Sequence, residues 1–191
     1  MYFANIEPLA DLENQGQWEK ARELLYDTWK RDKSDCKNLV RLLAECWYIM
    51  TDYDIGRITD ADISYETVKN TLIECVEFGM ENFMENSQFL CIAGYMITQF
   101  PYFFYRNKPF RNDDALYGKW ERIGADMRRK ANDAIPPDKL AKFLHLGHIG
   151  DSLGYDEARE VYRDEILDLL PGKTEVEIYF RHILLTPIVW E

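Results

Sequence analysis

Hydrophobic residues recur at intervals of three and four positions along most of the chain, which is the spacing of an amphipathic helix. Between positions 17 and 31, for example, Trp18, Ala21, Leu25 and Trp29 form one apolar stripe. Runs of alternating β-branched residues are almost absent, so the predicted fold class is all-α. The pattern predicts helices over residues 17–31, 37–50, 65–83, 87–100, 114–134, 139–153, 155–170 and 174–185.

Capping and breaking residues set the expected ends of these helices. Ser64 and Asp138 are suited to be N-caps, because a short polar side chain can accept a hydrogen bond from the first helical turn. Pro101 forbids further helical hydrogen bonding and ends the helix before it, and the pair Pro171-Gly172 ends the helix over residues 155–170. Gly154 is expected to break the helix between residues 139 and 170 into two.

Two segments, residues 51–63 and 101–112, do not follow the helical pattern. Loops of a dozen residues are uncommon in compact domains and often functional. Neither segment has the Gly and Ser bias of a flexible linker. We therefore predict a single helical domain over residues 1–191, with both segments inside it.

An internal repeat is visible in the predicted helices. Three of them share a large residue, then an apolar residue, then a small residue that lets a neighbouring helix approach: Val40-x-x-Leu43-Ala44, Leu90-x-x-Ala93-Gly94 and Phe143-x-x-Leu146-Gly147. Four others share an aromatic residue followed at fixed offsets by two apolar residues: Trp18-x-x-Ala21-x-x-x-Leu25, Tyr65-x-x-Val68-x-x-x-Leu72, Trp120-x-x-Ile123-x-x-x-Met127 and Tyr155-x-x-Ala158-x-x-x-Tyr162. Trp120 and Tyr155 are 35 positions apart.

The repeat resembles the tetratricopeptide repeat (TPR), a helix–turn–helix unit of about 34 residues. The clearest matches are the hexapeptides at 16–21 (GQWEKA) and 153–158 (LGYDEA), and the ending Ala131-x-x-Ala134-x-Pro136. The resemblance covers most of residues 5–170, with breaks in spacing at the two non-helical segments. It implies a TPR-like α-solenoid of about four helix pairs plus a C-terminal helix. An irregular helical bundle is the alternative.

The same resemblance implies that the protein binds a protein or peptide in a concave groove lined by the first helix of each pair. Carried over by register, the groove positions are Arg41, Glu45, Tyr48, Cys91, Tyr95, Thr98, Gln99, Leu144, His148, Asp151 and Ser152. Among them we take Tyr95, His148 and Asp151 as candidate contact residues. The alternative is that these positions are only the solvated face of amphipathic helices.

The charge balance limits the class of partner. The chain has 23 Lys and Arg against 34 Asp and Glu, a formal net charge of −11. This charge repels phosphate and disfavours a nucleic-acid binder, whereas it favours a basic protein partner. The four cysteines form no CxxC pair and lie in apolar segments, as buried free thiols do. No signal peptide or membrane span is apparent, so we expect a cytoplasmic protein.

Segment 51–63 carries four of the candidate contact residues, Asp52, Asp54, Asp60 and Asp62. Its spacing differs from that of an EF-hand calcium loop, because Gly56 stands at position 5 and Ile63 at position 12, where a bidentate Glu is needed. We expect a solvated acidic loop that attracts a basic partner.

The second segment supplies the aromatic candidates, Tyr102, Phe103, Phe104 and Tyr105, together with Arg106. Aromatic residues and arginine are enriched at binding hot spots. The alternative is that these rings fill space between helix pairs as part of the core.

His145, His148 and Asp151 share one face of a predicted helix and could bind a metal, although no ligand pair from a second helix accompanies them. No nucleotide-binding or serine-hydrolase motif is present. We therefore expect a non-enzymatic protein-binding module without cofactor or metal, most specifically an inhibitor or immunity protein that neutralises a basic partner such as a bacterial nuclease toxin. The alternatives are a TPR-like chaperone or adaptor that binds an extended peptide, and a helical metal-dependent hydrolase that uses His145 and His148.

Overall fold

The computed structural model describes residues 2–53, 55–56, 58–106, 113–136 and 138–186, and only the backbone of His148 and Ser152. The described residues form helices joined by turns and short loops, with one isolated β-bridge among them between Tyr53 and Ile58. This confirms the all-α class. The helices are α1 (Leu9–Asn14), α2 (Trp18–Arg31), α3 (Cys36–Asp52), α4 (Tyr65–Asn82), α5 (Ser87–Gln99), the 3₁₀ helix η1 (Pro101–Phe104), α6 (Asp114–Asn132), α7 (Lys139–Ile149), α8 (Ser152–Leu169) and α9 (Glu175–Leu185).

The two predicted N-caps, Ser64 and Asp138, are confirmed, and further helices are capped in the same way. A side-chain oxygen of the residue before α4, α5, α6, α7 and α9 accepts a hydrogen bond from a backbone N–H of the first turn, which satisfies a donor that has no partner inside the helix. These capping residues are Ser64, Asn86, Asp113, Asp138 and Thr174.

The predicted break at Gly154 is wrong. The interruption lies at Gly150, whose left-handed backbone (φ 73°) ends α7. Asp151 then caps α8, and its side chain accepts a hydrogen bond from the N–H of Gly154 at 2.9 Å. Gly154 is therefore part of the first turn of α8. The structure also adds α1 and η1, which the sequence pattern did not predict, because both are too short to show a helical period.

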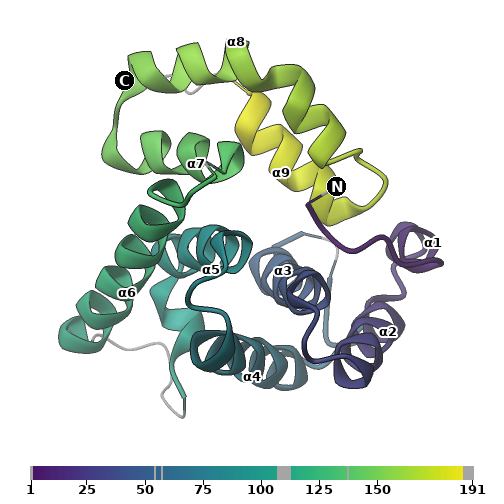
Figure 1. Ribbon diagram of the computed structural model, residues 1–191. Coiled ribbons are helices and arrows are strands. Elements are labelled where there is room, and N and C mark those ends of the chain that lie inside the picture. The colour runs from purple at the N-terminus through teal and green to yellow at the C-terminus, as the bar shows by residue number, and fades with distance from the viewer. Residues whose placement is uncertain (1, 54, 57, 107–112, 137, 187–191) are drawn as a thin grey trace.

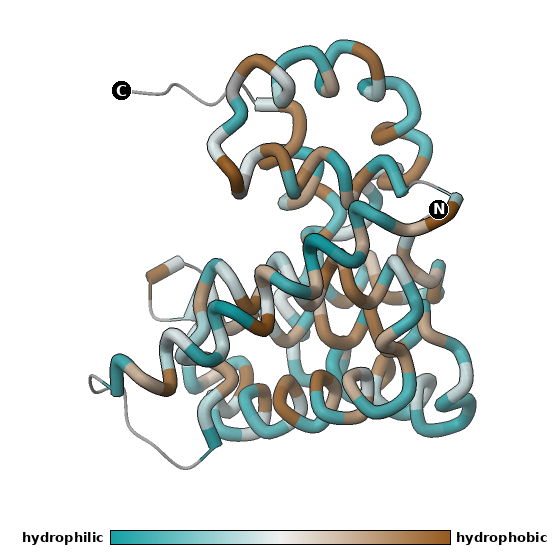
Figure 2. Tube along the Cα trace, turned by 60° about the vertical axis from the view of Figure 1, so that its left-hand side comes forward, coloured by the Kyte–Doolittle hydropathy of each residue, from teal (hydrophilic) through white to brown (hydrophobic). Residues whose placement is uncertain are grey.

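Most helices pack against their neighbours in the sequence (Figure 1). Helix α3 packs against α2 and α4, α5 packs against α6, and α7 packs against α6 and α8. In addition, α3 contacts α5 and α5 contacts α7, so these three form a row. Hydrophobic and hydrophilic stretches are interspersed along the helices (Figure 2), as expected when apolar residues recur every three or four positions.

Small residues allow the closest approach in this arrangement. A Cβ atom on Gly94 of α5 would lie 3.0 Å from the backbone N of Arg128 and 3.0 Å from the backbone O of Gly124, both in α6. A Cβ on Gly147 of α7 would lie 3.2 Å from the ring of Tyr155. Two of the small positions in the repeat therefore lie at helix contacts, as the sequence analysis predicts.

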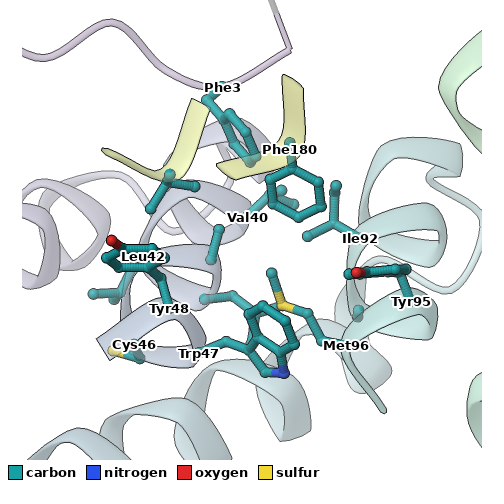
Figure 3. Packing of buried hydrophobic residues seen from close by; sticks show 14 of the residues in the cluster. Phe3, Val40, Leu42, Cys46, Trp47, Tyr48, Ile92, Tyr95, Met96 and Phe180 are labelled. Atoms are coloured by element: carbon teal, nitrogen blue, oxygen red, sulfur yellow. The ribbon is translucent and has the colours of Figure 1, made fainter. Parts of the chain in front are cut away.

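Helix α9 packs across α3 and α5 (Figure 3). The ring of Tyr179 lies 5.5 Å from that of Trp47 and 6.0 Å from that of Tyr48, and the ring of Phe180 lies 5.7 Å from that of Tyr95. Phe3 of the N-terminal segment packs against Phe180 at 5.8 Å. Helix α9 and the first residues thus cover the faces of α3 and α5 that the resemblance to the tetratricopeptide repeat predicted to line a binding groove.

The groove positions on these faces are therefore buried rather than presented to solvent. Arg41, Glu45, Tyr48, Cys91 and Tyr95 are each at most 8% exposed, and Leu144, the groove position on α7, is 4% exposed. The expectation that they line an open groove is wrong for this reason. Thr98 is half-buried, and only Gln99 remains exposed on α5.

Three of the buried charges form one cluster. Arg41 pairs with Glu45 at 2.8 Å and with Glu13 of α1, and Glu13 also accepts a hydrogen bond from the backbone N–H of Glu175 at the start of α9. All three side chains are at most 2% exposed, and Oε1 of Glu45 has no partner among the described residues. The cluster therefore connects α1, α3 and α9 through two carboxyl groups that share one guanidinium.

This sharing predicts an unusual dependence of stability on pH. Burial, with the charge of Glu45, raises the pKa of the Glu13 carboxyl from 4.5 to about 8. The folded protein then holds a proton that the unfolded chain has released, so stability is full below pH 4.5 and falls as the pH rises through 8. We expect a loss of up to about 1.4 kcal/mol per pH unit.

Urea melts of the wild type and of Glu13→Gln between pH 5.5 and 8 measure this effect, since the difference between them cancels other titrations. The glutamine variant should lack the decline. Parallel stability curves for the two proteins would contradict the raised pKa of Glu13.

Candidate binding pocket between α3 and η1

The two segments without helical periodicity meet at a pocket of about 480 Å³. The end of α3 and the residues after it form one wall, and η1 with the residue before it forms the other. The lining residues are Met50, Thr51, Tyr53, Ile55, Asp60, Tyr65, Phe100, Tyr102 and Phe103. Five of the nine are aromatic, and Asp60 is the one charged residue among them. We call this the aromatic pocket.

Tyr53 positions the first wall. Its ring lies 5.1 Å from the ring of Tyr65 in an edge-to-face arrangement. Its hydroxyl lies 3.0 Å from the backbone O of Ile63 and also hydrogen-bonds to the carboxylate of Asp60. Tyr53 is 9% exposed, so a buried anchor fixes the acidic segment against the start of α4.

The second wall consists of packed aromatic rings. Pro101 begins η1, as proline commonly does at the first helical position. The ring of Phe103 lies 5.1 Å from that of Phe100 and 4.9 Å from that of Tyr102, and Phe100 packs on Trp47 at 5.7 Å. These contacts connect the wall directly to the hydrophobic core.

Most of the aromatic segment is core rather than surface. Phe103 is 5% exposed, Phe104 1% and Tyr105 6%, and the ring of Phe104 packs on Trp120 of α6. The interpretation of Phe104 and Tyr105 as contact residues is corrected here, because both are buried and neither lines the pocket, whereas Phe103 is buried but forms part of the pocket wall. The segment is also not irregular backbone, since η1 occupies its first four residues.

Tyr102 and Arg106 differ from their neighbours. Tyr102 is half-buried and lines the aromatic pocket, and burial raises the pKa of its hydroxyl. Arg106 is exposed and forms a bidentate ion pair with Glu77 of α4, through its Nε and Nη2 atoms. Tyr102 is therefore the member of the aromatic segment that is both accessible and part of the pocket.

The acidic residues lie around the same site. Asp60 is exposed on the pocket and has no ion pair within the described part of the chain. Asp62 accepts hydrogen bonds from the backbone N–H and the hydroxyl of Thr59, both at 3.0 Å. Asp52 ends α3, and Asp54 lies outside the described residues. The loop is thus folded around its own carboxylates, with the charge of Asp60 facing the pocket.

The candidates from the groove lie elsewhere. Tyr95 is buried with its hydroxyl 3.4 Å from that of Tyr179, and Asp151 caps α8. The side chain of His148 lies outside the described part of the chain. Burial lowers the pKa of His145. No group of three metal-binding side chains was found among the described residues.

The chemistry of the aromatic pocket suits a cation attached to an apolar stem. Burial raises the pKa of Tyr65 to about 12, so its hydroxyl is neutral at physiological pH. Neutral rings attract a lysine or arginine head through their π faces, and the carboxylate of Asp60 adds a charged hydrogen bond. The lining residues include no cysteine, histidine or serine that could act as a nucleophile or base.

Sequence reasoning found Asp60, Tyr102 and Phe103 but missed the rest of the lining. The pattern places Met50, Tyr65 and Phe100 at predicted helix ends, and it places Tyr53 in the non-helical segment 51–63 without marking it as a site residue. The available signal was that aromatic residues, such as Tyr65 and Phe100, stand at helix ends next to the two non-helical segments. Nothing in the sequence shows that those segments meet.

Comparison with protein-family models, with curated proteins and with solved structures found no match. Within the described residues, no helix is both long and apolar enough to cross a membrane.

Proposed function

We propose that the protein acts without catalysis by binding a basic protein partner, and that a lysine or arginine side chain of the partner enters the aromatic pocket. The observation that carries the proposal is Asp60, an exposed carboxylate without an ion pair in the described chain, at the rim of a pocket walled by five aromatic rings. The formal net charge of −11 adds long-range attraction for the same kind of partner.

Within this class, a dedicated inhibitor or immunity protein for a basic toxin such as a nuclease is the specific function that we propose. A small acidic protein with a preformed pocket can block a basic surface without any conformational step. The fold is proposed to be a degenerate TPR-like α-solenoid, on the basis of the α3, α5 and α7 row and the alternating helix contacts. Because α9 covers α3 and α5, we favour binding at the aromatic pocket over binding of an extended peptide in the groove.

The pocket is tested first with a defined probe, the blocked tripeptide acetyl-Gly-Arg-Gly-amide, followed by NMR titration. Its analogue with citrulline in place of arginine has nearly the same shape but no charge. We expect the arginine peptide to perturb signals of the pocket residues and the citrulline peptide to bind at least about tenfold more weakly, since hydrogen bonds to charged groups contribute about 1.5–3 kcal/mol.

Two variants separate local from long-range charge. Asp60→Asn and Asp62→Asn remove the same charge from the same loop, but only Asp60 lines the pocket. Asp60→Asn should weaken the arginine peptide by about tenfold, and Asp62→Asn by no more than about twofold. Equal effects of the two variants would assign the attraction to the general field of the protein and would exclude the pocket.

The inhibitor role is tested by affinity purification from the native cell with the wild type and both variants. The expected partner is a basic protein that the wild type and Asp62→Asn retain, that Asp60→Asn loses, and whose activity falls when the wild type is added. Retention of an acidic partner, or retention of the basic protein without loss of its activity, would contradict inhibition.

A further inference from the structure

A second pocket lies where five helices meet, and it shares no lining residue with the aromatic pocket. It has a volume of about 220 Å³ and is lined by side chains from α5, α6, α7, α8 and α9. The lining residues are Tyr95, Gln99, Arg128, Leu144, Gly147, Tyr155 and Ile183. Arg128 is the one charged residue among these seven, and it is 3% exposed.

The guanidinium of Arg128 is only partly satisfied. Nη1 donates to the hydroxyl of Thr98 at 2.9 Å, and Nη2 donates to the backbone O of Leu144. Nε is buried and has no acceptor among the described residues. An arginine side chain has five N–H donors, so more than half of them remain available. No carboxylate in the described chain pairs with Arg128.

This arginine therefore brings to the pocket a positive charge that no carboxylate of the described chain neutralises, with a cation–π contact to the ring of Tyr95, whose centre lies 5.7 Å from the guanidinium carbon. Burial lowers the pKa of Arg128 to about 10, which still leaves it protonated at neutral pH. Burial, with the charge of Arg128, also lowers the pKa of the nearby His145, so that imidazole adds no second charge at neutral pH. A buried charge without a counter-ion is unfavourable, and a bound anion would relieve that penalty.

We infer that this pocket binds a small monocarboxylic acid, with the carboxylate paired to Arg128. A guanidinium binds a carboxylate through two parallel N–H donors. One positive charge matches the single charge of a carboxylate better than the double charge of a phosphate. Leu144 and Ile183 provide apolar surface for a short carbon chain.

The remaining polar groups fit the same ligand. The hydroxyl of Tyr155 donates to the backbone O of Ile183 at 3.0 Å, and the hydroxyls of Tyr95 and Tyr179 lie 3.4 Å apart. The hydroxyl of Tyr155 is thus used within the protein, whereas the donors of Arg128 and of the exposed Gln99 amide are available to a ligand. The pocket thus has one strong anion-binding group, the guanidinium of Arg128, and walls whose tyrosine hydroxyls are hydrogen-bonded within the protein.

The inference is tested by calorimetry and thermal melts with butanoate, with butanamide as the uncharged analogue of the same shape, and with inorganic phosphate. Butanoate should bind saturably and raise the melting temperature, and butanamide should not. Arg128→Met should weaken butanoate by at least about tenfold, because it removes a charged hydrogen-bond donor. The matched control Arg122→Met removes an exposed arginine from the same helix and should change binding by no more than about twofold.

Each outcome decides the inference. Equal effects of butanoate and butanamide on the wild type would overturn it, and this comparison holds even if Arg128→Met fails to fold. Tighter binding of phosphate, or unchanged butanoate binding by a folded Arg128→Met, would also overturn it. The dipeptide Gly-Leu, compared with its C-terminal amide, separates a free acid from the terminus of a peptide. If the dipeptide binds and butanoate does not, the small-acid assignment is wrong.

Discussion

Replacement of Arg41 by methionine should lower the free energy of unfolding by about 3–5 kcal/mol, because it leaves the buried Glu45 carboxylate uncompensated and takes the hydrogen-bond partner from the Glu13 carboxyl. Arg41 is 1% exposed and pairs with both Glu13 and Glu45. Methionine keeps much of the volume of the side chain, so the loss reports on charge rather than on a cavity. Urea unfolding at pH 7 measures it.

The exposed Lys37 on the same helix provides a matched control. Lys37→Met removes the same charge and should change stability by less than about 1 kcal/mol. The triple variant with Arg41→Met, Glu13→Gln and Glu45→Gln should recover part of the loss, since it removes the buried carboxylates. If the triple variant is no more stable than the single one, the cost does not arise from uncompensated charge.

Truncation of Phe104 to alanine should also be costly, with an expected loss of about 3–5 kcal/mol for a fully buried ring. Phe104 is 1% exposed and packs on Trp120 at 5.6 Å. The same variant should leave the intrinsic affinity of the folded protein for the arginine peptide nearly unchanged, because Phe104 does not line the aromatic pocket. A melt and a binding titration on one preparation measure both quantities.

Tyr102→Ala is the informative comparison, since Tyr102 lies in the same short helix but lines the pocket. It should lose less stability than Phe104→Ala and more affinity for the arginine peptide. Arg106→Ala should alter neither quantity beyond error, because Arg106 is exposed and pairs with Glu77 on the surface. If Tyr102→Ala lost more stability and less affinity than Phe104→Ala, the assignment of Phe104 to the core and of Tyr102 to the pocket would be wrong.

The sequence predicted the helical elements well because their signals are local. An apolar stripe and a capping side chain such as Ser64 or Asp138 act within one or two turns, so they can be read from neighbouring positions. Gly154 shows the limit of that reasoning. Gly150 and Gly154 both precede the aromatic position Tyr155, and the identity of a glycine does not say which one adopts the left-handed backbone.

Neither the covered groove nor the pockets could be predicted in this way. An amphipathic pattern shows which face of α9 is apolar, but it does not show that the face packs on Trp47 and Tyr95. The aromatic pocket has the same origin, because Tyr53 and Phe103 come together only through the packing of α3, α4 and η1. Arg128 appears in the sequence as one basic residue among several, and only the structure shows that it lacks an acidic partner.

The contact between Phe3 and Phe180 has a consequence for how the chain folds during its synthesis. Nearly the whole chain separates these two residues, and the backbone N–H of Tyr2 also donates to the backbone O of Leu169. Contacts between residues so distant in sequence must wait for the loop between them to close, which slows folding. Until α9 leaves the ribosome, the apolar faces of α3 and α5 stay uncovered, so a nascent chain of this protein should depend on chaperones until its last helix docks.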